Sequence, residues 1–153
     1  MNESRPDAVK GKDVTGIAVC FFCHDGKGNF LIQKRGMQVR THAGTWDVGG
    51  GTIEYGELIE DALRREVQEE YGTEPLSHTL LGHREYVHAT SGHRIMFDHL
   101  VLVDPTRVSI GEPDKVEEIR WSTLDDIPHP HFPQLDTAIA QWRDVLTSIN
   151  AHA

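Results

Sequence analysis

Three glutamates, Glu66, Glu69 and Glu70, follow one another at helical spacing in the stretch R-R-E-V-Q-E-E-Y-G. At about 100° per residue, they share one stripe of a helix with apolar side chains that should pack inward. These apolar residues are Ile59, Ala62, Leu63 and Val67. Carboxylates on an inward stripe lose hydration and repel one another, and Arg65, four residues before Glu69, cannot neutralise all three. A hard divalent cation such as Mg²⁺ can, because it binds carboxylate oxygens and keeps waters and substrate phosphates as its other ligands.

The same acidic run has a second interpretation, a solvated helix face, which is the usual role of charged runs on helices. The alignment of the glutamates with Ile59 and Leu63 favours the metal site. The opposite side of the helix should face solvent, and it carries Asp61, Arg64 and Gln68, flanked by Glu60. The pattern stops at Gly72, a residue suited to a helix C-terminus, and it is preceded by a glycine turn at residues 49–51.

The stretch from Gly51 to Thr73 resembles the Nudix box, whose pattern is G-x5-E-x7-R-E-U-x-E-E-x-G-U, with U a bulky aliphatic residue. Every fixed glycine, glutamate and arginine of the pattern is present. The chain departs from it at Thr73, which replaces the last aliphatic residue, and at Gly49, where many members have proline. Neither position is a candidate ligand, so the departures concern local packing.

The resemblance implies roles for the matching side chains. It implies that Glu66, Glu69 and Glu70 are metal ligands and that Glu57 contacts the metal directly or through water. Arg65 matches an arginine that orients a ligand glutamate. As general base we expect Glu66 first and Glu69 second, with a residue outside the box as the alternative that some members use. The implied cofactor is Mg²⁺, with Mn²⁺ as a substitute.

Residues outside the helix are expected to bind substrate or to complete the metal shell. Gly50 and Gly51 let the backbone approach the start of the helix closely. Arg35 stands where related enzymes often hold a phosphate-binding cation, with an ordinary surface cation as the alternative. The segment G-E-P-D-K-V-E-E-I-R-W resembles a stretch of members that cleave nucleoside triphosphates. It contains four acids, at least three of which we expect to be solvated: Glu112, Asp114, Glu117 and Glu118.

The composition is that of an acidic globular chain of 153 residues, with a formal net charge of -9 and 38% hydrophobic residues. This length suits one domain, which we assign to residues 14–153 after a flexible tail at residues 1–13. No run approaches the ~20 apolar residues of a membrane span, and no secretory signal is evident, which favours a cytoplasmic protein without membrane contact. The negative charge disfavours a nucleic-acid polymer as partner. We therefore expect a small nucleotide as ligand, bound by a monomer or homodimer.

The remaining sequence predicts the elements that position these groups. Strand patterns occur at residues 15–23, 30–34, 45–48, 76–88, 94–104 and 116–121, with a turn at 89–92. The strand at 94–104 is strongly apolar, so we expect it in the middle of the sheet. Apolar residues at helical spacing from Leu135 to Ile149 predict a C-terminal helix. This order indicates an α/β (α+β) fold with a mixed sheet between helices, and the resemblance implies a Nudix-type α/β/α sandwich.

Cys20 and Cys23 form a C-x-x-C pattern within the first strand. Residues three apart in a strand point to opposite faces, so this pair cannot clamp one metal ion. We expect two buried thiols in a reducing compartment. Trp46, Tyr86 and Phe97 are candidates to stack on a base, with core packing as the alternative.

The function implied by the resemblance is metal-dependent hydrolysis of a nucleoside diphosphate linked to another group, with water attacking phosphorus. The favoured substrate is a (deoxy)nucleoside triphosphate or a modified one, cleaved to the monophosphate and pyrophosphate. ADP-ribose or a nucleotide sugar is an alternative substrate. A nucleotide-sensing module without catalysis is an alternative class, disfavoured because Glu57, Arg65 and the three later glutamates are all intact. An isopentenyl-diphosphate isomerase, suggested by T-H-A-G-T-W-D, would need a cysteine near the tryptophan, and the sequence has none there.

Overall fold

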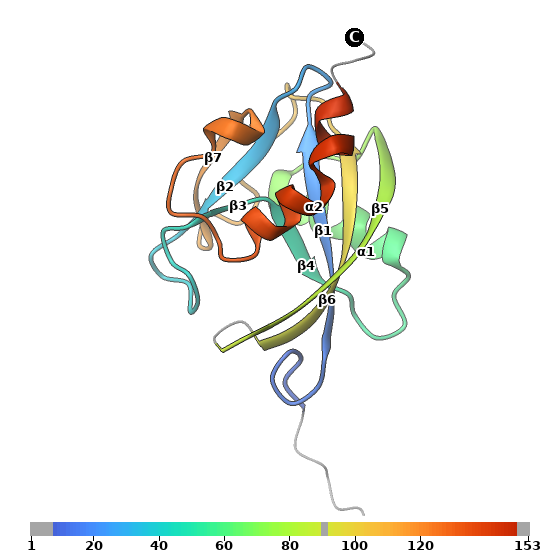
Figure 1. The fold of residues 1–153 in the computed structure, drawn as a ribbon, viewed down its shortest axis with the longest axis vertical. Coiled ribbons are helices and arrows are strands. Elements are labelled where there is room, and N and C mark those ends of the chain that lie inside the picture. Colours follow the sequence, from blue (N-terminus) through green and yellow to red (C-terminus); the bar gives the residue numbers. More distant parts are fainter. Residues whose placement is uncertain (1–7, 90–91, 150–153) are drawn as a thin grey trace, which may run out of the picture.

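The computed structural model describes residues 8–89 and 92–149. Its strands are β1 (Gly16–His24), β2 (Phe30–Arg35), β3 (Trp46–Asp47), β4 (Gly49–Thr52), β5 (Ser77–His88), β6 (Gly92–Leu102) and β7 (Val116–Ser122). They form one sheet in the order β3-β2-β1-β6-β5, with β4 paired to β1 and β7 paired to β2 (Figure 1). The β1–β6 pair is parallel and the other pairs are antiparallel, so the sheet is mixed. β6 lies between β1 and β5, which confirms its predicted interior position.

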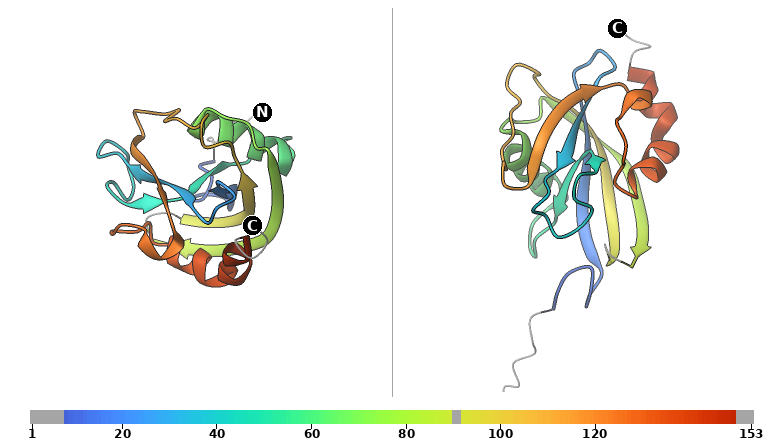
Figure 2. Two further views of the ribbon diagram at one scale, coloured as in Figure 1. Left: turned by 90° about the horizontal axis from the view of Figure 1, so that it is seen from above. Right: turned by 90° about the vertical axis from the view of Figure 1, so that its left-hand side faces the viewer.

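Two helices cover the two faces of this sheet, as the right-hand view of Figure 2 shows. The core on one face includes side chains of α1 (Ile59–Tyr71), namely Ala62, Leu63, Val67 and Tyr71. The core on the other face includes side chains of α2 (Leu135–Thr147), namely Leu135, Ala138, Ile139 and Leu146. A short 3₁₀ turn, η1 (Leu124–Asp126), connects β7 toward α2. The predicted α/β/α sandwich is therefore confirmed.

β1 is buried along almost its whole length, because a core lies on each side of it. Cys20 belongs to the core beneath α2 and Cys23 to the core beneath α1. Both are free thiols, and burial raises the pKa of each well above its ordinary value. The prediction of two buried thiols on opposite faces is confirmed.

The prediction of a glycine turn at residues 49–51 is wrong, because these residues form strand β4. Gly49, Gly50 and Gly51 pair antiparallel with Phe21, Cys20 and Val19 of β1, respectively. Glycine is required here because neighbouring atoms leave no room for a β-carbon, and not because the chain turns. A β-carbon at Gly49 would overlap the Phe21 ring, and one at Gly51 would overlap the Glu66 carboxyl group. The strand thus brings bare backbone against β1 and α1.

Two other expectations fall partly outside the described residues. Of the expected N-terminal tail, residues 1–7 are not described, whereas the Gly11 carbonyl accepts a hydrogen bond from the His93 N–H at 2.7 Å. The expected turn at 89–92 includes residues 90–91, which are also not described. Within the described ranges, no helix has the length and apolar character needed to cross a membrane.

Candidate active site

Arg65 lies among the carboxylates of the box and hydrogen-bonds to three of them. Its Nε and Nη2 donate to the two carboxylate oxygens of Glu57 at 2.8 and 2.9 Å. Its Nη1 donates to Glu66 at 2.9 Å and to Glu69 at 3.2 Å, as the spacing of Arg65 and Glu69 predicts. Hydrogen bonds from Arg65 hold the pKa of Glu57 down at about 2, and the same contacts raise the pKa of Arg65. The guanidinium therefore anchors the loop before α1 to the helix itself, a role that Thr52 supports by accepting from Nη2 at 3.1 Å.

Glu66 and Glu70 are buried on the inner side of α1, with exposed fractions of 9% and 8%. Burial raises the pKa of both carboxyl groups, and the negative charge of Glu66 raises the pKa of Glu70 further. Glu70 accepts a hydrogen bond from the Gly50 N–H at 3.1 Å, so strand β4 and α1 meet at this carboxylate. Two neighbouring carboxylates thus share a poorly hydrated site.

Glu69 does not lie on the inward stripe with its two neighbours, and this part of the helix prediction is wrong. Its side chain is 48% exposed. One residue along a helix turns the side chain by about 100°, which carries Glu69 from the buried direction of Glu70 to the edge of the helix. The hydrogen bond to Arg65 nevertheless keeps its carboxylate beside the site.

Glu112 is the acid of the 112–118 segment that comes near this pair. The Gly111 N–H donates to the Glu70 carbonyl at 2.9 Å, which fastens the loop before β7 to the end of α1. The negative charge of Glu112 contributes to the raised pKa values of Glu66 and Glu70. The other acids are directed elsewhere: Glu117 pairs with Lys34, Glu118 pairs with Arg120, and Asp114 is exposed.

The donor set around Arg65 fits a hard divalent cation. The atoms that could bind a metal here are carboxylate oxygens, the ligands that Mg²⁺ and Mn²⁺ prefer. The glutamates at this site also outnumber the single guanidinium of Arg65. As the side chains stand, no group of three or more His, Cys, Asp and Glu residues among those described is close enough to hold a metal ion. Arg65 draws Glu57 and Glu69 toward itself, while Glu66 and Glu70 remain buried with raised pKa values. This excess of buried negative charge is what a bound cation would offset.

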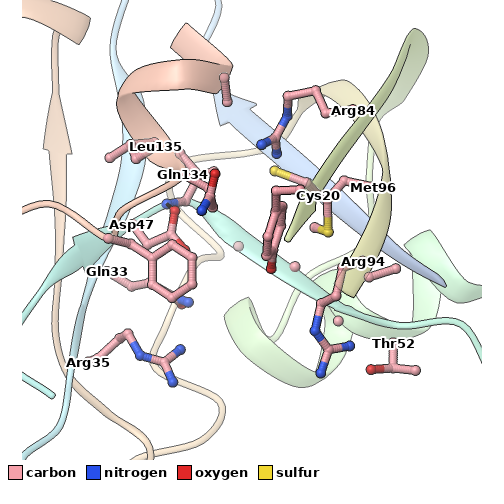
Figure 3. Close-up of a pocket in the computed structure, with 18 of the residues that line it drawn as sticks. Cys20, Gln33, Arg35, Asp47, Thr52, Arg84, Arg94, Met96, Gln134 and Leu135 are labelled. Atoms are coloured by element: carbon pink, nitrogen blue, oxygen red, sulfur yellow. Dashed lines mark hydrogen bonds between the residues drawn. The ribbon is translucent and has the colours of Figure 1, made fainter. Parts of the chain in front are cut away.

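A cavity of about 320 Å³ opens beside Glu70 and the backbone of β4 (Figure 3). Three arginines line it, of which Arg35 was expected from the sequence and Arg84 and Arg94 were not. Arg35 donates to the Thr41 carbonyl at 3.0 Å and faces the Phe132 ring at 5.5 Å.

The two unexpected arginines differ in their partners. Arg84 forms a buried ion pair with Asp98, which also accepts from Trp142 Nε1 at 2.6 Å. Arg94 has no carboxylate partner among the described residues and lies across the cavity from Arg35 in Figure 3. The cavity therefore offers positive charge on two sides.

Comparisons with known proteins identify the family to which the chain belongs. A family model of the NUDIX domain matches residues 14–142. The chain belongs to the Nudix family. A human NAD-capped RNA hydrolase is 34% identical over 95 residues, which are 60% of this chain and 19% of that protein. A mouse oxidized purine nucleoside triphosphate hydrolase is 34% identical over 99 residues, or 63% of this chain and 58% of that protein.

A solved structure agrees with the fold of this Nudix chain. The crystal structure of a MutT NUDIX hydrolase from Burkholderia pseudomallei matches with a TM-score of 0.74 and 28% identity, over 82% of this chain and 96% of that one. The two curated relatives above are longer, so this chain spans only part of their length.

Several residues of the Nudix site were not identified from the sequence. Gln33, Asp47 and Phe132 line the cavity. Gln33 could have been noticed as a polar residue in the apolar run F-L-I-Q of a strand. Trp46, a candidate base-stacking residue, is instead buried in the core, with the Arg120 guanidinium 4.8 Å from its ring. Of the three aromatic candidates, Tyr86 is the one that lines the cavity.

Gly51→Ala is expected to lower kcat about 100-fold, because the added methyl group would displace the Glu66 carboxyl and a shift of about 1 Å can cost that much. Overpacking should also destabilise the fold by about 1–3 kcal/mol. Gly56→Ala is the control: its β-carbon meets open space, although its φ of 81° adds strain. Kinetics and thermal melting check both variants, and wild-type kcat in Gly51→Ala would contradict the close packing of β4 on Glu66.

Proposed function

We propose that the protein is a metal-dependent pyrophosphohydrolase that cleaves a nucleoside triphosphate, or a modified one, to the monophosphate and pyrophosphate. The observation that carries this proposal is the buried pair Glu66 and Glu70 beside a cavity with cations on two sides. Mg²⁺ or Mn²⁺ held by Glu57, Glu66, Glu69 and Glu70 would neutralise phosphate charge and acidify a water molecule. The similar mouse protein, named an oxidized purine nucleoside triphosphate hydrolase, supports this choice of substrate.

The protein's own residues perform the remaining tasks in this proposal. Arg65 holds Glu57 and Glu69 in place through its hydrogen bonds. Glu66 is the preferred general base, a choice that follows the family resemblance of the box. Arg35 and Arg94 lie where they can bind the phosphate chain.

A substrate panel tests the proposal. The purified protein is incubated with Mg²⁺ and, separately, with nucleoside triphosphates, oxidised nucleoside triphosphates, ADP-ribose and a nucleotide sugar. Release of a nucleoside monophosphate and pyrophosphate from a triphosphate is the expected result. Cleavage of ADP-ribose alone would move the assignment to the alternative substrate class, and no cleavage of any compound would refute hydrolysis.

Arg65→Ala is expected to lower kcat about 100-fold, because Glu57 and Glu69 would lose the donor that positions them. The matched control is Arg64→Ala, on the solvent side of the same helix. The Arg64 side chain is 44% exposed and pairs with Glu60 at 3.2 Å, and such a surface pair is worth only ~0–1 kcal/mol. Kinetics and melting of both variants at matched Mg²⁺ decide the point. Equal, small effects would mean that Arg65 is an ordinary surface residue.

A further inference from the structure

Gln33 is a buried amide whose hydrogen bonding is incomplete within the protein. Its exposed fraction is 6%, and its Oε1 atom has no hydrogen-bond partner among the described residues. The side chain lines the cavity (Figure 3). Buried polar groups in folded proteins are nearly always paired, and an unpaired one costs free energy. A ligand in the cavity would complete the pairing.

Asp47 lies beside Gln33 through strand pairing. The two residues are direct partners in the β2–β3 register, which places their side chains next to each other on one face. One carboxyl oxygen of Asp47 accepts the Val48 N–H at 2.8 Å. Figure 3 shows Asp47 and Gln33 together on one wall of the cavity, away from Arg94. Burial raises the pKa of Asp47 to about 7, against the lowering effect of Arg35 and Arg84.

This pair does not suit the phosphate part of a nucleotide. A phosphate next to Asp47 would meet an acidic group, whereas Arg94 offers positive charge across the cavity. The aromatic side chains of Tyr86 and Phe132 also line the cavity and suit the flat face of a ring. The wall at Gln33 and Asp47 therefore fits the polar edge of a heterocycle.

The hydrogen-bonding groups of Gln33 and Asp47 determine which edge of a base they can bind. In its ionised form the Asp47 carboxyl group is an acceptor beside the Gln33 oxygen, and the two complement N–H donors on adjacent positions of a ring. Guanine carries such donors at N1 and at its 2-amino group. If the Gln33 amide is rotated by 180°, its NH₂ group faces the cavity and complements the carbonyl oxygen next to the same N1–H. The orientation with the oxygen toward the cavity is the one that selects a guanine-type edge, because adenine offers its amine beside a ring acceptor.

We propose that Gln33 and Asp47 are specificity-determining residues that bind the N1–H and 2-amino edge of a guanine-type base. This inference rests on the proposed function for the placement of the phosphates. It concerns base recognition only, so it can be tested without hydrolysis.

The experiment measures binding and turnover separately. Titration calorimetry without metal ions gives the Kd of GMP, IMP and AMP, where IMP lacks only the 2-amino group of GMP. Hydrolysis with Mg²⁺ gives kcat and KM for GTP, ITP and ATP. The variants are Gln33→Leu, Gln33→Met and Asp47→Asn, and the matched control is Gln68→Leu, which changes an exposed glutamine of α1. Two substitutions at Gln33 ensure that a folding defect in one leaves the other to decide.

We expect the unmodified protein to bind GMP about 10-fold more tightly than IMP or AMP, because a site built for a donor rejects a ligand that lacks it. Loss of the Gln33 amide should weaken GMP binding about 10-fold and raise KM for GTP more than it lowers kcat. Asp47→Asn should bring GMP and IMP to similar affinities, and Gln68→Leu should change nothing.

The outcomes separate this inference from the proposed function. Equal affinities of the unmodified protein for the three monophosphates, unchanged discrimination after loss of the Gln33 amide, or no binding of GMP would each overturn base recognition by this pair. The expected binding pattern without cleavage of any triphosphate would support the base site and refute the proposed hydrolysis instead.

Discussion

Glu70→Gln is expected to lower kcat by about 100-fold or more while making the metal-free protein more stable. The carboxylate is 8% exposed and lies beside Glu66. A carboxamide would bind a cation more weakly, and misplacing a reacting group by about 1 Å can cost ~100-fold in rate. The same change removes a buried negative charge but keeps an oxygen to accept the Gly50 N–H. Activity and stability should therefore move in opposite directions.

The stability gain of Glu70→Gln should depend on pH in a defined direction. The pKa of Glu70 is raised in the folded protein. Its contribution to the stability of the folded state is therefore fully present below the pKa of about 4.3 in the unfolded chain, and it is lost as pH rises through the pKa in the folded state. Melting curves measured in chelator should show that the melting temperature of the variant increases relative to that of the wild type as pH rises. Glu74→Gln, which changes an exposed glutamate beyond α1, is the control. Wild-type kcat at saturating Mg²⁺ would exclude Glu70 from the metal site.

Removal of divalent cations is expected to abolish turnover, and added Mg²⁺ or Mn²⁺ is expected to restore it. The physical reason is the buried negative charge of Glu66 and Glu70. Arg65 contacts Glu66, but no cation among the described residues contacts Glu70. Because a ligand that binds only the folded state stabilises it, Mg²⁺ should raise the melting temperature of the wild type and do so less in Glu70→Gln. Undiminished turnover in excess chelator would refute metal dependence.

The helix of the Nudix box could be predicted from the sequence because its information is local. Apolar spacing and Gly72 define α1, which ends at Tyr71 with Gly72 in the left-handed conformation. The predicted inward orientation of Glu69 was wrong because the buried stripe of the helix has a finite width, and this residue lies at its edge. The pairing of Arg65 with Glu57 was missed because it depends on how the preceding loop folds back.

The strand and cavity residues depend on contacts between segments that are distant in sequence. Three successive glycines have low strand propensity, so β4 appears as a turn until β1 and α1 are known to press on it. Gln33 and Asp47 become neighbours only through the β2–β3 register. The residues of the box were therefore accessible from the sequence, whereas the cavity residues that we propose to select the base were not.

The placement of Cys20 and Cys23 in opposite cores makes the two thiols natural reporters of local opening. Buried thiols with raised pKa values react with alkylating reagents only when the surrounding structure opens. Variants that keep one cysteine would report the opening of the α1 layer and of the α2 layer separately. Labelling rates with and without nucleotide would then reveal which layer of the sandwich a ligand rigidifies.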